Sequence, residues 1–341
     1  MKQAVMTSPG VIEFRDVPVP KPGPNEVLIR VRRIGVCGSD IHVRHGRHPF
    51  TSYPVVQGHE FSGVLEAVGK RVKGLRPGQK VTATPQIVCG RCAPCRRGDY
   101  HICDVLRVQG FQAPGCAQEF FLARADQIVP LPASFSFEQG ALVEPAAVGV
   151  HTVSRAGAMA GTNVAVLGAG PIGNLVGQAA RAAGAKVLMT DISEYRLEIA
   201  RRCGLRSVSL AGRETLKDAS ERVFGAKGFQ KAFECAGAEA AINEAIDAIQ
   251  KGGTIVAVGV YGDRPRVNMG LVQDRELTLT GTLMYQKRDF VKAVRLMRSG
   301  ALVTAPLETA HFPFEEYRAA YDYADREGER SMKIFVDLET N

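Results

Sequence analysis

Several features that mark particular classes of protein are scarce or missing in this chain. It has no tryptophan, its aromatic content is 7%, and it contains neither an internal repeat nor a low-complexity segment. No run of about 18 uncharged apolar residues occurs, which argues against a transmembrane helix. The first ten residues also lack the basic patch and apolar core of a secretory signal. We therefore expect a cytoplasmic protein with no membrane partner.

The charge is basic but not concentrated. Lys and Arg number 43 against 35 Asp and Glu, giving a net charge of +8, and they are spread without a stripe or an aromatic-interleaved run. Nucleic-acid binding is therefore not indicated. A chain of 341 residues that is 45% hydrophobic and 23% charged is typical of a globular protein of about two domains. Eight cysteines without a secretory signal favour reduced thiols over a disulfide framework.

Two patterns of secondary structure follow one another along the chain. The first third is rich in Gly, Pro and β-branched residues, and its short apolar runs predict a strand-rich, partly barrel-like lobe. From Asn163 onward, predicted strands alternate with predicted helices, which favours a doubly wound parallel sheet and an α/β fold class. We expect the tail, Pro306–Leu338, to return to the first lobe.

Half of the cysteines lie in one short loop with the spacing C-x2-C-x2-C-x7-C. Four soft thiolates close together are the ligands that a closed tetrahedral zinc site requires. The residues between them are small, turn-forming and basic, so the backbone can fold tightly and the arginines offset the thiolate charge. The pattern predicts a structural zinc site, and it is too compact for a zinc-ribbon nucleic-acid binder. Its ligands are Cys89, Cys92, Cys95 and Cys103.

Residues 168–173 read GAGPIG and fit the GxGxxG pattern of a dinucleotide-binding loop. The loop follows an apolar strand and opens an Ala-rich helix, the context in which this pattern is informative. A carboxylate ends the next strand; it would accept from ribose hydroxyls and repel a 2′-phosphate, so we expect NAD, and a nearby arginine leaves NADP as the alternative. The predicted cofactor residues are Gly168, Gly170, Pro171, Ile172, Gly173, Asp191 and Arg196.

A second, sparser set of metal-ligand types comes earlier in the chain. Cys37 lies in GVCGSDIH, His59 and Glu60 lie in GHEFSG, and Glu144 lies in LVEP. A thiolate, an imidazole and one or two carboxylates fit a catalytic zinc with an exchangeable position. Taken singly, each residue has an ordinary alternative: a buried cysteine, a core histidine or a glutamate that caps a turn.

These motifs, with VGVH between LVEP and GAGPIG, resemble those of the zinc-dependent medium-chain dehydrogenase/reductase family, in the family's order and over nearly the whole chain. The combination is similar to the polyol and sugar dehydrogenase branch, which also includes threonine dehydrogenases. The resemblance implies a GroES-like, β-rich substrate domain at residues 1–144 with 285–341, and a Rossmann domain at residues 145–284. It also implies two zinc ions per chain, one catalytic and one structural.

Carried over residue by residue, the resemblance makes Cys37 and His59 catalytic-zinc ligands. Glu60 and Glu144 would lie at or beside this metal, and which of them binds directly stays open. Ser39 and His42 occupy proton-relay positions, with Ser39 taking the hydroxyl proton and passing it through the cofactor ribose to His42. A surface loop histidine is the alternative for His42.

The implied reaction is oxidation of a secondary alcohol of a polyol, sugar or sugar acid by hydride transfer to NAD. L-threonine 3-dehydrogenase activity is the alternative enzyme, and a non-catalytic zinc- and nucleotide-binding protein is the alternative of another class. The basic loop Arg44, His45, Arg47 and His48 could favour an acidic sugar, or could be merely solvated. The family suggests a homodimer or tetramer, and the alternating Leu277–Leu283 could be an edge strand at a two-fold axis.

Overall fold

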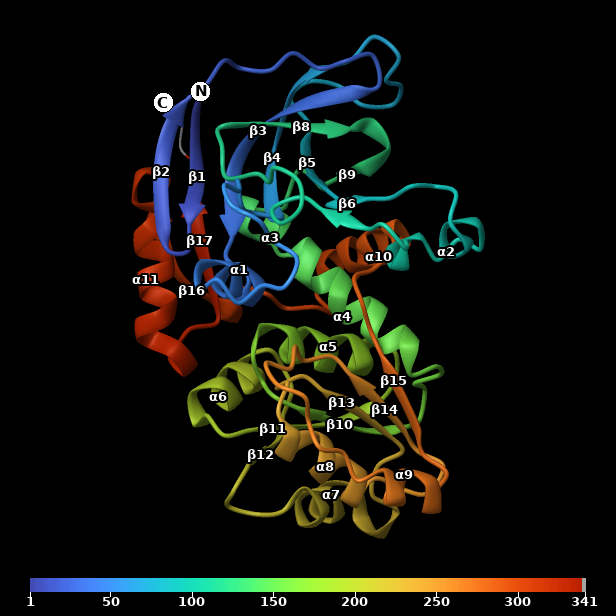
Figure 1. Ribbon diagram of the computed structural model, residues 1–341. Helices are drawn as coiled ribbons and strands as arrows, with labels where there is room; N and C mark the ends of the chain where they lie inside the picture. Colours follow the sequence, from blue (N-terminus) through green and yellow to red (C-terminus); the bar gives the residue numbers. More distant parts are fainter. Residues whose placement is uncertain (339–341) are drawn as a thin grey trace. The chain divides into compact units, whose positions relative to one another are not determined.

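The computed structural model describes residues 1–338 and divides the chain into two compact units, drawn in Figure 1. The first unit contains Met1–Glu144, Gln286–Val294 and the residues from Glu308 onward. The second contains Pro145–Tyr285 and Arg295–Leu307. The chain thus returns twice to the first unit, and the excursion at Arg295–Leu307 was not separated in the sequence analysis.

A seven-stranded sheet forms the framework of the first unit, in the order β16-β17-β3-β4-β5-β9 with β8 also paired to β3. One half of β3 pairs with β8 and its other end pairs with β17, so a single strand joins two sides of the sheet, as in a partly closed barrel. The strands are β3 (Glu26–Gly35), β4 (Glu60–Val68), β5 (Lys80–Ala83), β8 (Phe120–Arg124), β9 (Ile128–Pro130), β16 (Glu308–Pro313) and β17 (Lys333–Asp337).

Shorter elements complete this unit and cover its core. The core contains Ile29, Ile34, Phe61 and Leu65 from the sheet, together with tyrosines of the helix α11. The additional elements are β1 (Lys2–Ser8), β2 (Val11–Asp16), α1 (Gly38–Arg44), β6 (Gln86–Ile87), α2 (Ala93–Arg96), β7 (Arg107–Val108), α3 (Phe137–Ala141) and α11 (Tyr317–Glu327). Two helices include residues of both units: α4 (Val143–Arg155) and α10 (Lys287–Arg298).

The second unit is built on a six-stranded parallel sheet with the order β12-β11-β10-β13-β14-β15. In Figure 1, α5 and α6 cover one face of this sheet and α7, α8 and α9 cover the other. The strands are β10 (Asn163–Leu167), β11 (Lys186–Asp191), β12 (Ser207–Leu210), β13 (Lys231–Glu234), β14 (Thr254–Ala257) and β15 (Thr278–Gly281). The helices are α5 (Pro171–Ala182), α6 (Glu194–Arg202), α7 (Leu216–Phe224), α8 (Glu239–Ala248) and α9 (Met269–Asp274).

This strand order creates the position at which a Rossmann sheet binds its ligand. The chain runs outward from β10 to β11 and β12, then crosses back to β13, so connections leave the carboxyl ends of β10 and β13 in opposite directions. Helices cover both faces, which explains why β10 is almost continuously apolar and buried. The predicted α/β class, a doubly wound sheet in one unit and a strand-rich, partly barrel-like fold in the other, is confirmed.

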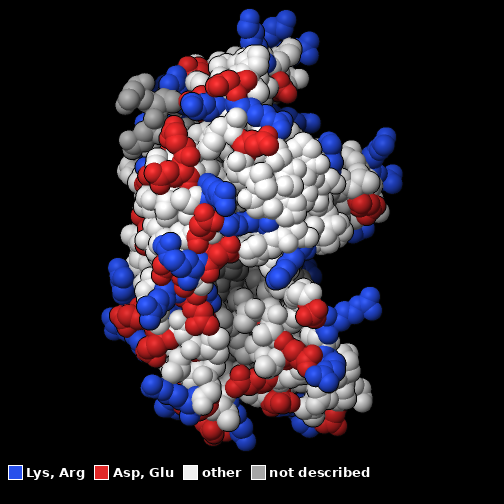
Figure 2. All heavy atoms as spheres, turned by 60° about the vertical axis from the view of Figure 1, so that its left-hand side comes forward, with Lys and Arg blue, Asp and Glu red and all other residues white. Residues whose placement is uncertain are grey.

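The surface is mixed in charge. On the face drawn in Figure 2, Lys and Arg are interspersed with Asp and Glu around a broad uncharged area, and no stripe of one sign crosses it. No helix within residues 1–338 has the length and apolar character needed to cross a membrane.

Candidate active site

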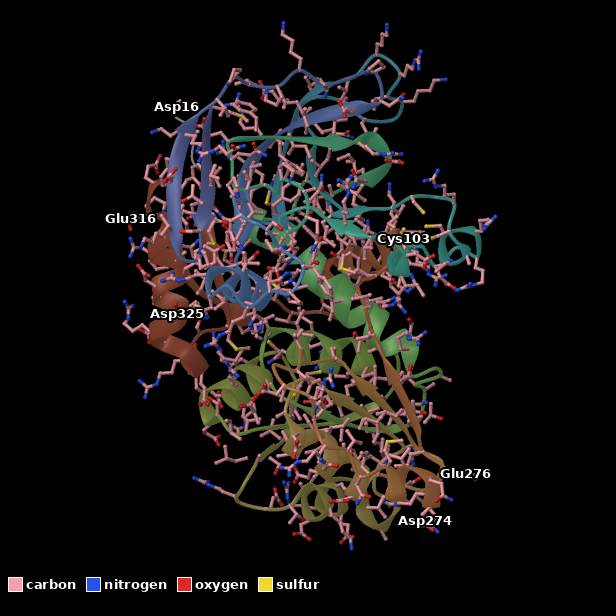
Figure 3. The ribbon with its side chains drawn as sticks, in the orientation of Figure 1. Asp16, Cys103, Asp274, Glu276, Glu316 and Asp325 are labelled. Atoms are coloured by element: carbon pink, nitrogen blue, oxygen red, sulfur yellow. The ribbon has the colours of Figure 1, made fainter. Side chains whose placement is uncertain are left out.

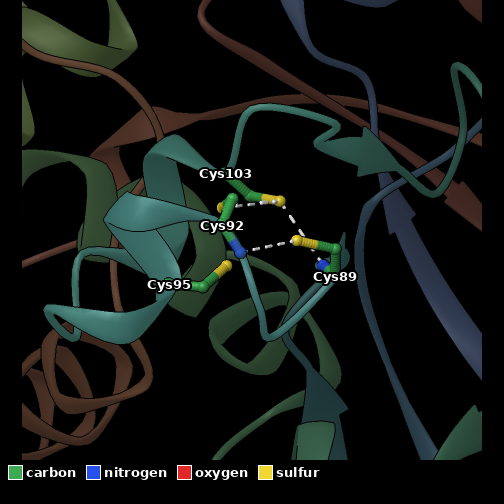
Figure 4. Close-up of side chains that lie close together, drawn as sticks. All are labelled: Cys89, Cys92, Cys95 and Cys103. Carbon is green, nitrogen blue, oxygen red and sulfur yellow. Dashed lines mark hydrogen bonds between the residues drawn. The ribbon is translucent and has the colours of Figure 1, made fainter.

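The four cysteines of the compact loop converge on one point. Their sulfur atoms all lie within 4.8 Å of one another, and Figure 4 shows the four side chains turned toward a common centre. The sulfurs of Cys92 and Cys103 are 3.8 Å apart. Tetrahedral zinc with Zn–S bonds of about 2.3 Å requires sulfurs about 3.8 Å apart, so the four thiols fit this metal.

Backbone hydrogen bonds favour the thiolate form of Cys89, the form that zinc requires. The N–H groups of Arg91 and Cys92 donate to the sulfur of Cys89 at 3.4 and 3.3 Å, and these bonds lower the pKa of the Cys89 thiol to about 6. The lobe is attached to the rest of its unit, since the Gln286 amide donates to the Gly98 carbonyl at 3.0 Å. Metal binding here therefore organises a loop that is connected to α10.

Replacing Cys103, the most buried of the four, should remove the structural zinc. In a Cys103→Ser variant we expect metal analysis to find one zinc fewer per chain and the melting temperature to fall, because a structural zinc contributes directly to folding. The matched control is Cys203→Ala, which deletes a buried thiol outside either metal cluster. Unchanged zinc content in Cys103→Ser would exclude Cys103 as a ligand.

The second cluster is assembled by strand pairing. Gly35 at the end of β3 pairs with Glu60 at the start of β4, so Cys37, two residues beyond Gly35, meets His59. The ligand atoms of Cys37, His59 and Glu60 lie within 4.8 Å of one another. A Cβ on Gly35 would lie 2.5 Å from Oε2 of Glu60, so a larger residue here would displace the Glu60 carboxylate.

This second set fits an open zinc site. One thiolate, one imidazole and one carboxylate provide three protein ligands and leave a position for an exchangeable group. Cys37 is the N-cap of α1, so its side chain lies at the start of this helix. Glu144 is buried in the first turn of α4 and raises the pKa of His59, but it lies outside the close set that the described residues form.

Asp40 belongs to the site and was not assigned from the sequence. Its side chain is 1% exposed, accepts from the Cys37 N–H at 3.0 Å, and lies 3.6 Å from Nδ1 of His59. Burial by itself would lower the pKa of His59, but the charges of Asp40 and Cys37 raise it well above its usual value. Nδ1 has no hydrogen-bond partner among the described residues, so Asp40 acts on the ring through its charge, and Nε2 is left for a metal.

Lys333 is a second residue that the sequence analysis missed. Its ammonium contacts both oxygens of Glu60, at 2.5 Å from Oε1, and donates to the Val36 carbonyl at 3.3 Å. The two side chains are 4% and 1% exposed. Burial alone would lower the pKa of Lys333, but the Glu60 carboxylate raises it, so the ammonium stays charged. Lys333 therefore balances Glu60 and restricts its position.

The structure places both residues predicted for proton transfer on α1. Ser39 and His42 are three residues apart on this helix, so they share one face. Both are half-buried, and they follow directly on the metal-ligand type Cys37.

The first two members of the basic loop after Cys37 are paired with acids of α11. Arg44 forms an ion pair with Asp322, and its Nε lies 3.3 Å from Oδ2 of Asp325. Nε2 of His45 lies 3.1 Å from Oδ1 of Asp325, which is labelled on α11 in Figure 3. The carboxylates of Asp322 and Asp325 therefore offset part of the positive charge of this loop.

The last member of that loop is held by aromatic stacking. The ring of His48 stacks on Phe111 at 4.7 Å, and Phe111 in turn contacts the ring of His59 at 4.9 Å. Burial lowers the pKa of His48, so this ring is a neutral group near the cluster rather than a cation. Within the loop, only Arg47 remains as an exposed charged side chain.

In the second unit, the glycine-rich loop has the geometry that its pattern predicts. Gly168 has a φ of +100°, and a Cβ on Gly173 would lie 1.8 Å from the Gly168 carbonyl oxygen, so a side chain is excluded at both positions. The loop ends at Gly170, the N-cap of α5, whose first turn begins with Pro171 and Ile172. The N-terminus of α5 thus meets the carboxyl end of β10, as required for pyrophosphate binding.

Asp191 braces this loop. Its Oδ2 accepts from the Ala169 N–H at 2.6 Å and its Oδ1 accepts from the Ser193 N–H at 2.8 Å. The carboxylate lies at the end of β11, beside the loop, where a nucleotide ribose binds in this fold. Arg196 follows in the first turn of α6, so both residues weighed for cofactor choice lie at the same edge of the sheet.

Comparison with known proteins agrees with this geometry. Residues 23–133 match the alcohol dehydrogenase GroES-like domain, and residues 171–299 match the zinc-binding dehydrogenase domain. Sorbitol dehydrogenase of Bacillus subtilis (strain 168) is 31% identical over 342 residues, covering 98% of this chain and 97% of the relative. The chain belongs to the zinc-dependent medium-chain dehydrogenase family. The resemblance drawn from the sequence motifs is therefore confirmed.

Other members of the medium-chain dehydrogenase family match equally well and carry different names. L-galactonate-5-dehydrogenase of Escherichia coli (strain K12) is 32% identical, with 94% of each chain covered. L-threonine 3-dehydrogenase of Rhizobium johnstonii is 34% identical over 344 residues, covering 99% of this chain and 98% of the relative. Membership supports a zinc-dependent oxidoreductase that acts on a CH–OH group, and it does not single out a substrate.

Solved structures of dehydrogenases match over nearly the full length. A zinc-binding dehydrogenase from Sinorhizobium meliloti 1021 bound to NADP has a TM-score of 0.90 at 30% identity, with 99% of each chain covered. An alcohol dehydrogenase from Escherichia coli CFT073 complexed with NADH has a TM-score of 0.91 at 26% identity, also with 99% of each chain covered. The likeness supports a nicotinamide cofactor for this dehydrogenase. It does not distinguish NAD from NADP, because one of the two structures contains NADP and the other NADH.

Proposed function

We propose that this protein is a zinc- and NAD-dependent dehydrogenase that oxidises a secondary alcohol of a polyol, sugar or sugar acid to the ketone. The observation that carries the proposal is the close set of Cys37, His59 and Glu60 in a chain whose other unit has a dinucleotide-binding loop. A non-catalytic descendant of the family would not need three buried or half-buried ligands that leave a coordination position open.

In this proposal, Cys37 and His59 hold the catalytic zinc, with Glu60 or Glu144 as the carboxylate. When bound, zinc supplies Lewis-acid activation of the substrate hydroxyl, and the nicotinamide accepts the hydride. The charge of Asp40 favours one orientation of the His59 ring, and the ammonium of Lys333 restricts the position of the Glu60 carboxylate. Ser39 accepts the hydroxyl proton and His42, on the same face of α1, returns it to solvent.

The proposed substrate class, a polyol, sugar or sugar acid, is supported by relatives named for sorbitol and L-galactonate. The loop after Cys37 bears on the choice between neutral and acidic members of this class. Since Arg44 and His45 are paired with α11, we expect this loop to give no strong preference for acids. The test is NADH formation across matched polyols, aldonic acids and threonine with zinc-replete enzyme. Turnover of threonine alone would replace the proposal by L-threonine 3-dehydrogenase activity, the name of another relative. Inactivity on every compound, with zinc and NAD bound, would favour the non-catalytic alternative.

We propose NAD rather than NADP because of the Asp191 carboxylate. An Asp191→Asn variant keeps an acceptor for the Ala169 N–H and removes the negative charge, so the kcat/KM ratio of NADP to NAD should rise by roughly tenfold, which corresponds to about 1.4 kcal/mol. Steady-state kinetics with both cofactors measures this ratio. An equal change in Asp191→Asn and in a distant control such as Asp274→Asn would mean that Asp191 does not select the cofactor.

We further propose a cytoplasmic homo-oligomer. All eight cysteines are free of disulfides, which suits a reducing compartment. The strand β15 lies at the end of the sheet order, and Leu279 and Leu283 near it are 39% and 55% exposed. An exposed, partly apolar edge strand is a surface that a second copy could extend. Light scattering of the purified protein would measure the mass, and a monomer would contradict this proposal.

A further inference from the structure

A row of buried polar side chains leads from Asp40, beside His59, to helix α11. The phenol of Tyr321 donates to Oε1 of Gln57 at 2.9 Å. The Gln57 amide then donates to Oδ1 of Asp40 at 3.4 Å and to the Asp40 carbonyl at 3.3 Å. Gln57, Asp40 and Tyr321 are 2%, 1% and 0% exposed. Asp40 faces Nδ1 of His59, so the row ends at the metal cluster.

The direction of each hydrogen bond in this row is defined by chemistry. The phenol of Tyr321 has one proton, which it gives to the Gln57 carbonyl oxygen, and the Gln57 nitrogen can only donate. If the amide rotated by half a turn, its nitrogen would face the phenol and its oxygen would face the Asp40 carboxylate. The second contact would then be repulsive. Gln57 therefore has one stable orientation, in which it supplies a donor to the same Asp40 oxygen that faces His59.

The outer end of the row is also held in place. The ring of Tyr321 packs against Tyr317 with centroids 5.5 Å apart, and the guanidinium of Arg44 lies over it at 5.7 Å from the centroid. Arg44 is itself paired with two aspartates of α11. Because a buried polar group is costly unless it is bonded, the hydrogen bonds among Tyr321, Gln57 and Asp40 favour one arrangement of these three side chains. The last step, from Oδ1 of Asp40 to Nδ1 of His59, is a charge contact at 3.6 Å and not a hydrogen bond.

We propose that Gln57 and Tyr321 are positioning residues for the metal ligand His59, acting through Asp40. The inference rests on the proposed zinc chemistry of the Cys37–His59 cluster. Partners beyond the metal ligands commonly change metal affinity by about 10- to 100-fold. Since Gln57 and Tyr321 act one and two steps farther out, we expect their loss to speed zinc release from this cluster by roughly 3- to 10-fold.

The test measures zinc release from the holoenzyme to a coloured chelator, in wild type and in Tyr321→Phe and Gln57→Met variants. The two metal sites should release zinc in separate phases, and the phase missing in His59→Ala belongs to the catalytic cluster. We expect that phase alone to accelerate, while release from the four-cysteine lobe stays unchanged. Tyr323→Phe, which deletes a hydroxyl from the same helix outside the row, is the matched control and should release zinc at the wild-type rate.

Two further measurements separate positioning from a general loss of stability. Cobalt bound in place of the catalytic zinc should show a shifted visible absorption band in Tyr321→Phe, because the orientation of its imidazole ligand changes. The double variant should release zinc no faster than Gln57→Met alone, since the two residues act in series. If Tyr321→Phe fails to fold, Gln57→Met decides by the same two readouts.

Unaltered release rates and cobalt spectra in both variants would overturn the proposal. Failure of the proposed function would look different. The wild-type enzyme would then hold zinc only in the four-cysteine lobe, and the zinc-release phase assigned to the catalytic cluster would be missing. The positioning role alone would be overturned if the wild-type enzyme held two zinc ions and oxidised an alcohol, while both variants kept the wild-type zinc release rate and cobalt spectrum.

Discussion

A His59→Ala variant should lose alcohol oxidation almost completely while keeping its fold and its cofactor binding. His59 is 6% exposed, and it joins Cys37 and Glu60 in a close set of ligand atoms. Without the imidazole we expect the catalytic zinc to be lost, together with the several kcal/mol that a Lewis acid contributes to the transition state. At about 1.36 kcal/mol per tenfold change, kcat should fall by roughly a thousandfold or more.

Metal analysis and cofactor binding separate this result from simple unfolding. The variant should retain the zinc of the four-cysteine lobe, because that cluster is formed by Cys89, Cys92, Cys95 and Cys103 alone. Binding of NADH, followed by fluorescence, should be unchanged, because the glycine-rich loop belongs to the other unit. His311→Ala, at a histidine of the same unit that pairs with Asp337, is the control and should keep both zinc ions. A His59→Ala enzyme with full activity would remove His59 from the site.

The parts of this protein that could be predicted are those in which neighbouring residues determine the outcome. β10 occupies Asn163–Leu167, the range expected from its apolar run, and Gly168 and Gly173 adopt the close turn that their spacing indicates. A buried parallel strand, a glycine turn and an Ala-rich helix follow one another directly in the sequence, so each can be predicted from neighbouring residues. The four cysteines are likewise within one loop, so their spacing alone predicted that they would meet.

Residues that act across long sequence separations could not be found in this way. Lys333 meets Glu60 across 273 positions, and Tyr321 meets Gln57 across 264. Lysine is rarely buried, so its place in an apolar strand pattern gave no reason to assign it a charged partner. Asp40 is different, since an acid three residues after an N-cap is a known capping pattern, and it could have been assigned from GVCGSDIH.

The loop after Cys37 shows that charge has to be located in space. Its four basic or titratable side chains left two interpretations open, a preference for an acidic sugar or a solvated loop, because the sequence shows only neighbours along the chain. The structure supplies Asp322 and Asp325 from α11, nearly three hundred residues later, and these neutralise Arg44 and His45. A cluster of one sign in sequence therefore predicts a field only when the facing elements are known.

Removal of the Lys333 ammonium should destabilise the first unit more than an ordinary core substitution. Glu60 would remain buried at 1% exposure without the ammonium that contacts both of its oxygens, and the Val36 carbonyl would also lose its donor. Breaking a buried ion pair on one side commonly costs about 3–5 kcal/mol. For Lys333→Met we therefore expect a fall in Tm of roughly 6–10 °C, measured by calorimetry.

A compensating variant tests whether the unpaired charge is the cause. Lys333→Met combined with Glu60→Gln leaves no buried charge at this point, so we expect it to recover most of the lost Tm, because a buried pair can be replaced by neutral groups at little cost. Glu60→Gln alone leaves the Lys333 ammonium buried without its carboxylate partner, so this variant should also be destabilised. A double variant no more stable than Lys333→Met would show that the loss arises from packing in β17. Recovery of stability without recovery of turnover would separate the two contributions of Glu60: as the partner of Lys333 in the fold, and as a carboxylate at the metal.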